Sequence, residues 1–174
     1  RLDRDTSGLV LLAKNPYSSC VLSDAVKDHT IHREYAAIVS GKTDASGTID
    51  LPIARKDGST IERVCDPERG ETAVTHYRTF AYNKDADISF IRLLLETGRT
   101  HQIRVHMKAI GHPLPGDFLY CPDYRFIDRQ PLHSTYLRFS HPVTGEKLEF
   151  SASLPEDMRK LFPDIKNPSG PVFF

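Results

Sequence analysis

Two runs of strand-forming residues, joined by a short polar link, most constrain how this chain can fold. Residues 73–82 alternate between apolar and polar side chains, and residues 88–96 read ISFIRLLLE. The link between them, NKDAD at 83–87, is typical of a turn. This arrangement predicts an antiparallel β-hairpin, so the fold must include antiparallel strand pairs.

A second hairpin is expected closer to the C-terminus. Residues 137–140 and 147–151 flank the link HPVTGE at 141–146, whose Pro and Gly favour a turn. Further strands are expected at residues 8–14, 35–39, 47–53 and 60–65. The last two lie in the turn-rich stretch 41–72, which we expect to be an irregular excursion over the surface.

Residues that favour the start or end of a helix lie between these predicted strands. Asn15 suits an N-cap and Pro16 suits the first helical position. Farther along, Thr100 can cap a second helix, and Gly111 can follow its last turn. Helices are expected at residues 15–28, 100–110 and 155–161. Hairpins with interspersed helices indicate an α+β fold, with a mostly antiparallel mixed sheet and flanking helices.

The predicted helix at residues 100–110 has two different faces. An apolar stripe, expected to face the core, is formed by Ile103, Met107 and Ile110. A polar face is formed at similar spacing by His101, Arg104 and Lys108. The spacing thus separates an apolar face of the helix from a polar one.

Size and charge narrow the function classes. The chain has 174 residues, close to one domain, and no linker divides it. Its 23 basic and 23 acidic residues balance, which argues against a uniformly basic surface but allows a local basic cleft. Three widely spaced cysteines indicate neither a disulfide framework nor a zinc site, and they suit a reducing cytoplasm. No apolar run approaches the ~18 residues of a membrane helix, so no membrane partner is expected.

The first residues hold two carboxylates that could carry chemistry. Asp3 and Asp5 are two residues apart and point to the same side of an extended chain. Such a pair could bind a metal or share acid–base work, whereas a plain polar turn before a strand is the simpler interpretation. Spacing alone does not choose between the two aspartates.

A second candidate site is the segment at 97–106, TGRTHQIRVH. It joins an apolar strand to a helix N-terminus, where free N–H groups and the helix dipole suit phosphate. A solvated basic turn is the competing interpretation. A metal site is not indicated, because the histidines at 101, 106 and 112 do not share one helical face. Tyr35, beside Arg33, could stack on a base, although a tyrosine at a strand start more often packs in the core.

Taken together, these segments resemble the RluA-type family of pseudouridine synthases. Residues 1–8 resemble the pattern RLDxxTSG, residues 33–39 REYxAxV, residues 97–106 TGRTHQIRVH, residues 111–117 GHPxxGD, and residues 132–133 with 140–146 a late LHA…HPxTGE stretch. The motifs occur in family order over about residues 1–150. The resemblance implies the pseudouridine synthase catalytic fold and an enzyme that isomerises uridine in structured RNA.

The resemblance also implies roles for individual residues. Asp3 matches the essential catalytic aspartate, and Arg104 matches the arginine that pairs with it and favours its ionised form. Tyr35 matches the tyrosine that stacks on the target base, and Ile103 is expected to pack against that base. Arg1 matches the arginine that fills the gap left by a flipped-out uridine. Neither a cofactor nor a metal is implied, since no atom is lost in the isomerisation.

The resemblance sets the expected scope as well. Large-subunit ribosomal RNA is the commonest family substrate and transfer RNA the second. We expect a monomeric catalytic domain at residues 1–174 that lacks its N-terminal segment and has no S4-like module. Glu71 replaces a basic residue, and Ser134 replaces an alanine, that are common in the family. A non-catalytic RNA-binding or RNA-chaperone protein on the same fold is the alternative.

Overall fold

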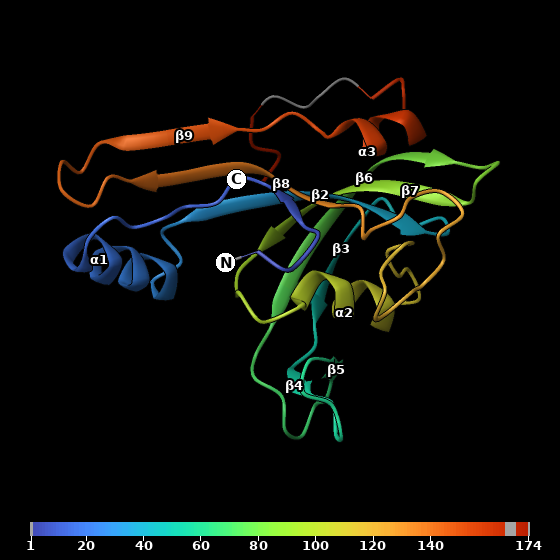
Figure 1. Ribbon diagram of the computed structural model, residues 1–174, viewed down its shortest axis with the longest axis horizontal. Helices are drawn as coiled ribbons and strands as arrows, with labels where there is room; N and C mark the ends of the chain where they lie inside the picture. The colour runs from blue at the N-terminus through green and yellow to red at the C-terminus, as the bar shows by residue number, and fades with distance from the viewer. Residues whose placement is uncertain (1, 166–169, 174) are drawn as a thin grey trace.

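One mixed sheet of seven strands organises the molecule (Figure 1). The computed structural model describes residues 2–165 and 170–173. The sheet strands are β1 (Ser7–Gly8), β2 (His32–Ser40), β3 (Ser46–Asp50), β6 (Val74–Asn83), β7 (Ile88–Leu95), β8 (Leu132–Ser140) and β9 (Lys147–Ser151). A separate two-stranded sheet is formed by β4 (Ile53–Arg55) and β5 (Arg63–Cys65). The helices are α1 (Pro16–Lys27), α2 (Gln102–Ala109) and α3 (Glu156–Leu161).

The strand order confirms the predicted fold class. The sheet runs β1-β8-β2-β7-β6-β3, and β9 pairs with β8. Every pair is antiparallel except β1 with β8. The two predicted hairpins are confirmed as β6–β7 and β8–β9. The fold is therefore α+β with a mostly antiparallel, mixed sheet.

The central strand β2 is buried on both faces of the sheet. Tyr35 and Ala37 pack with Ile103 of α2, whereas the alternate residues Ala36 and Ile38 pack with the α3 side. Side chains two apart in a strand share a face, so one strand serves both layers. Figure 1 shows α1 and α2 below the sheet and α3 above it. The tyrosine of the predicted site therefore points toward α2.

The first helix forms as its sequence signals predict. Asn15 is the N-cap, and its side chain accepts a hydrogen bond from the Ser18 N–H at 2.8 Å. Pro16 occupies the first helical position, where its missing N–H leaves no bond unmade. Leu22 anchors the helix in a small core with Leu137 and Phe139 of β8.

The predicted strand at residues 8–14 is wrong. Only Ser7 and Gly8 are in β1, and Leu9 adds one bond from its N–H to the Ser134 carbonyl at 3.0 Å. Beyond Leu9, residues 10–14 have no strand partner in the described part of the chain. A strand needs a neighbour for its backbone groups, and apolar composition alone cannot supply one. Leu12 is accordingly 79% exposed.

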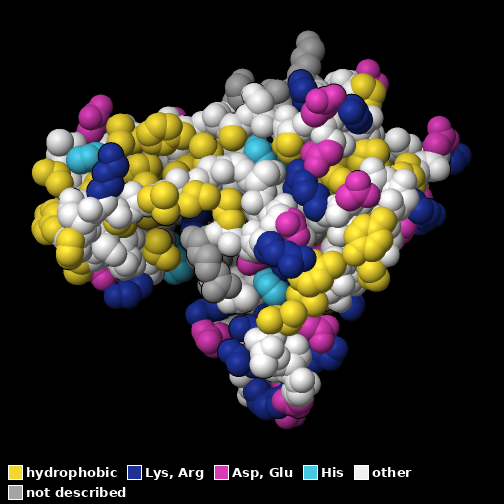
Figure 2. Space-filling view, in the orientation of Figure 1, with side chains coloured by type: hydrophobic (Ala, Val, Ile, Leu, Met, Phe, Trp, Pro, Cys, Tyr) yellow, Lys and Arg dark blue, Asp and Glu magenta, His cyan; other side chains and the backbone are white. Residues whose placement is uncertain are grey.

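The stretch 41–72 is more regular than predicted. β3 extends the main sheet by pairing with β6, and β4 and β5 form a hairpin that projects below α2 in Figure 1. Pro52 lies between β3 and β4, where its missing N–H cannot continue a ladder. Figure 2 shows charged side chains of both signs intermixed over this projection, and hydrophobic side chains gathered near α1. Among the described residues, no helix is long and apolar enough to cross a membrane.

Candidate active site

The carboxylate of Asp3 lies in a short loop before β1. The loop turns through a hydrogen bond from the Thr6 N–H to the Asp3 carbonyl at 3.1 Å. Arg129 donates to the Asp5 carbonyl at 3.0 Å, and the buried Gln130 side chain donates to the Arg4 carbonyl. A distant segment therefore fixes the backbone that presents Asp3.

The structure separates the two N-terminal aspartates. Asp3 lines a pocket of about 70 Å³, and its side chain is 15% exposed. Asp5 adopts a left-handed backbone conformation with φ of 67° and pairs with Arg4 at the surface, 3.1 Å away. Of the two aspartates, Asp3 therefore lines the pocket and Asp5 does not.

Arg104 connects Asp3 to a second carboxylate. Its Nη1 lies 3.4 Å from Asp3 Oδ2. Its Nε and Nη2 donate to Asp117 at 2.6 and 2.7 Å, and both side chains are almost fully buried. The planar guanidinium is therefore held by Asp117 with one corner directed at Asp3.

The pocket offers apolar and aromatic surface beside the carboxylate. Tyr35 and Ile103 both line it and are 6% and 4% exposed. A tyrosine hydroxyl is ordinarily neutral near pH 7, and burial raises the pKa of the Tyr35 hydroxyl further. The pocket can therefore hold a flat, uncharged group next to a carboxylate.

The start of α2 differs from its prediction. The N-cap is His101, with φ of 58°, and not Thr100. The side chain of Gln102 instead turns back to accept from the Arg99 N–H at 2.9 Å, and Gly111 ends the helix with φ of 85° as expected. The turn from strand to helix is thus held by a glutamine that the capping pattern did not predict.

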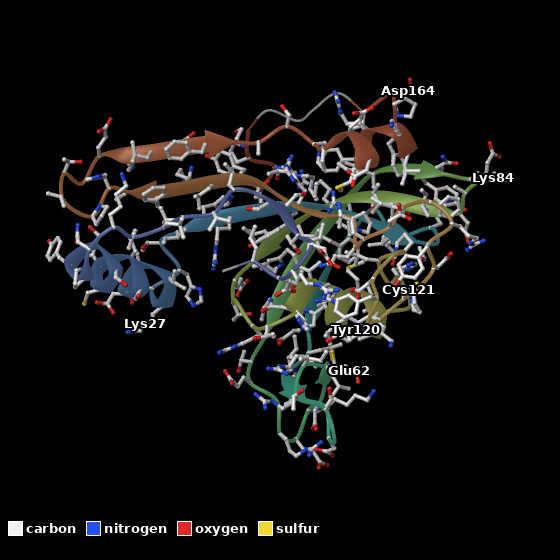
Figure 3. All side chains as sticks on the ribbon, in the orientation of Figure 1. Lys27, Glu62, Lys84, Tyr120, Cys121 and Asp164 are labelled. Atoms are coloured by element: carbon white, nitrogen blue, oxygen red, sulfur yellow. The ribbon has the colours of Figure 1, made fainter. Side chains whose placement is uncertain are left out.

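Tyr120 contacts all three residues of the predicted polar face of α2. Its ring lies 4.9 Å from the Arg104 guanidinium carbon and 5.6 Å from Lys108 Nζ. Its hydroxyl is 2.8 Å from His101 Nδ1 and accepts from the Arg63 N–H of β5 at 2.8 Å. Figure 3 shows Tyr120 beside α2, above the hairpin that carries Glu62. The expected shared face is confirmed, and it is built around an aromatic ring.

Charge near the pocket is local. Burial and the positive charge of Arg104 lower the pKa of His101. Arg99 forms an ion pair with Glu71, the acidic residue that departs from the family pattern. Arg4 lies 4.5 Å from the ring of Phe118. Several arginines therefore lie around one small pocket, although the net charge of the chain is zero.

A larger groove lies beside this pocket. It has a volume of about 340 Å³ and is lined mainly by residues 9–13 and α1, sharing Leu2, Arg33 and Tyr35 with the pocket. No carboxylate lines this groove, whereas Asp3 lines the smaller pocket. In the described ranges, no group of three His, Cys, Asp or Glu side chains is placed to hold a metal ion.

Four of the five predicted site residues come together. Asp3, Tyr35, Ile103 and Arg104 converge around the pocket, and Arg1 lies outside the described residues. The sequence reasoning missed the buried pair partner of Arg104 and the loop-holding Gln130. Asp117 closes the GHPxxGD motif, which was the available signal, whereas nothing in the local sequence marked Gln130.

Comparison with known proteins adds to this geometry. Residues 1–109 match the family model described as RNA pseudouridylate synthase. The chain is 50% identical over 162 residues to the uncharacterized RNA pseudouridine synthase YjbO of Bacillus subtilis (strain 168), covering 92% of this chain and 56% of that protein. It is 42% identical over 175 residues to the ribosomal large subunit pseudouridine synthase D of Zymomonas mobilis, covering 93% and 54%.

A solved structure shows the same fold. Human RNA Pseudouridylate Synthase Domain Containing 1 aligns with a TM-score of 0.75 and 28% identity, covering 87% of this chain and 66% of that one. The chain spans just over half the length of the curated relatives that it matches. The family match and the high identities are sufficient to place it: the chain belongs to the RluA-type family of RNA pseudouridine synthases.

Proposed function

We propose that this chain carries the active site of an RNA pseudouridine synthase, which isomerises specific uridines in structured RNA. The observation that carries the proposal is the placement of Asp3 at the pocket, 3.4 Å from the buried Arg104. The names of the relatives favour large-subunit ribosomal RNA as the substrate. Transfer RNA is the second choice.

The reaction exchanges one bond of the nucleoside for another. The bond from ribose C1′ to N1 of uracil breaks, and a bond from C1′ to C5 forms. The proton that leaves C5 is balanced by the one that N1 gains. Asp3 acts as a nucleophile on the sugar or base, or as a base on the ribose, and an ionised carboxylate suits each role. Since the atoms balance, we expect no cofactor or metal requirement.

The neighbours of Asp3 have proposed roles of their own. Tyr35 stacks on the target base, and Ile103 packs against it. Arg104 supplies the counter-charge for Asp3. Flipping a base out of a helix costs a few kcal/mol, and Arg1 offsets part of that cost by filling the gap. We also propose that the enzyme acts as a monomer in the cytoplasm.

Conversion of uridine in RNA transcripts tests the proposal. The full-length protein, its Asp3→Asn variant and the matched Asp5→Asn variant are incubated with large-subunit ribosomal and transfer RNA transcripts, and pseudouridine is mapped. Wild type and Asp5→Asn are expected to modify RNA, while Asp3→Asn does not. Wild-type turnover by Asp3→Asn would refute the assignment. RNA binding by the full-length protein without any pseudouridine would favour the non-catalytic alternative.

A further inference from the structure

Arg33 directs its side chain to the proposed active site from β2. Arg33 lines the same pocket as Asp3 and Tyr35. Tyr35 follows it by two residues in β2, so the two side chains share one face of the strand. Burial raises the pKa of the Tyr35 hydroxyl, and the positive charge of Arg33 partly opposes this increase. The position of Gly98 also borders it, because a Cβ there would lie 3.4 Å from Arg33 Nη2. The guanidinium therefore lies between β2 and the turn that leads into α2.

The adjacent acid does not neutralise Arg33. Glu34 faces the other side of the sheet, where its carboxylate accepts from Arg92 at 2.7 Å and from the Val172 N–H at 2.8 Å. Both side chains of that ion pair are fully buried. The charge of Glu34 is thus already satisfied on the far face.

The other arginines near the pocket, Arg99 and Arg104, already form ion pairs with acidic side chains. Arg99 pairs with Glu71 and donates to the Thr72 carbonyl at 3.0 Å, while Arg104 is held by Asp117 and Asp3. The Arg33 side chain has no hydrogen bond or ion pair within residues 2–165 and 170–173. Its Nε is shielded from solvent and still lacks an acceptor. Buried donors in folded proteins normally have partners, so this one points to a ligand.

We propose that Arg33 binds a phosphate group of the RNA backbone, at the target nucleotide or the one beside it. This inference rests on the proposed function. With the uracil placed against Tyr35 and Ile103 as proposed, Arg33 lines the same small pocket and is within reach of the nucleotide's backbone. A guanidinium donates two parallel N–H groups to one phosphate, a geometry that lysine cannot reproduce. Arg33 therefore fixes the nucleotide by its backbone and reads no base identity.

Salt-dependent RNA binding tests Arg33 directly. The full-length protein, Arg33→Met, Arg33→Lys and the control Arg159→Met are compared by measuring the Kd for substrate RNA at several salt concentrations. Arg159 is an exposed arginine of α3, on the opposite face of the sheet. Loss of one phosphate contact is expected to weaken binding about tenfold and to lower the slope of log K against log salt by about 0.7 to 0.9. Arg33→Lys is expected to keep most of the slope.

The outcomes separate this inference from the proposed function. If wild type forms pseudouridine but Arg33→Met has the same Kd and slope as Arg159→Met, the phosphate contact is refuted and the proposed function stands. If wild type forms no pseudouridine on any transcript, the proposed function fails first. Far-ultraviolet circular dichroism checks that Arg33→Met is folded, and a folded variant with the smaller slope supports the contact.

Discussion

Asp117 accepts two hydrogen bonds from Arg104, at 2.6 Å from Nε and 2.7 Å from Nη2, and this pairing sets where the third nitrogen lies. That nitrogen, Nη1, is 3.4 Å from Asp3. Asp117 also accepts from the Leu119 N–H at 3.0 Å, which fixes its own orientation. The proposed catalytic carboxylate is thus positioned against an arginine that another acid holds.

Replacing Asp117 should impair both stability and catalysis. In Asp117→Asn, Arg104 loses its buried counter-charge, and breaking one partner of a buried ion pair costs about 3 kcal/mol or more. Displacing Arg104 by about 1 Å is expected to lower kcat on the order of 100-fold. Urea denaturation and pseudouridine formation measure the two effects.

A surface aspartate provides the matched control. Asp123 pairs with Arg125, 2.6 Å away, and the Arg125 side chain is 74% exposed. Exposed ion pairs contribute little, so Asp123→Asn should leave the urea midpoint close to that of wild type. An Asp117→Asn variant that behaves like Asp123→Asn would contradict the structural role of the buried pair.

Removing both charges should separate folding from activity. Arg104→Met alone leaves Asp117 buried without its partner, so this variant is expected to be strongly destabilised. The double variant Arg104→Met with Asp117→Leu removes the stranded charge and should recover part of the free energy of unfolding, yet remain inactive. A double-mutant cycle in urea measures the coupling. Additive effects of the two substitutions on stability would argue against the pairing.

The features that sequence predicted are those set by local signals. The cap at Asn15, the stripe through Ile103 and the two hairpins depend on residues close together in the chain, and all are confirmed. The motifs also predicted which residues share the pocket. The Thr100 cap was a local signal that failed, because Gln102 and the left-handed His101 form the start of α2 instead. The other failure depends on distant partners. The strand at 8–14 lacks a neighbour beyond Leu9, and no local pattern announces a missing partner.

The supports of the site were beyond sequence reasoning for the same reason. Gln130 contacts the carbonyl of Arg4, 126 positions away in the chain. β8 brings these segments together, because it pairs with β1 on one edge and β2 on the other. Periodicity predicts that strands exist but not their order in a sheet. Family motifs gave the residues of the pocket, while their tertiary supports required the structure.

Gln130→Leu should lower activity with little change in stability. The Gln130 side chain is fully buried, and its Oε1 has no hydrogen-bond partner in the described part of the protein. Leucine removes the hydrogen bond to the Arg4 carbonyl and the long one to the Thr6 hydroxyl, but it also removes the unsatisfied acceptor, so the change in unfolding free energy should stay near about 1 kcal/mol. The loop carrying Asp3 loses its anchor, and kcat is expected to fall about tenfold or more. Unchanged kcat at saturating RNA would show that the loop needs no such support.

The buried His106 should make stability fall in mild acid. Burial lowers its pKa, and its ring lies 2.9 Å from both the Leu51 carbonyl and the Thr75 hydroxyl. The unfolded chain, with a histidine pKa of about 6.5, binds more protons than the folded chain between the two pKa values. Stability is therefore fully present above about pH 6.5 and is lost as the pH falls toward the folded-state pKa. The urea midpoint, measured at several pH values, should fall less in acid for His106→Gln than for wild type. His141→Gln, in the turn between β8 and β9, is the control and should behave like wild type. Equal losses in all three proteins would place the acid sensitivity elsewhere.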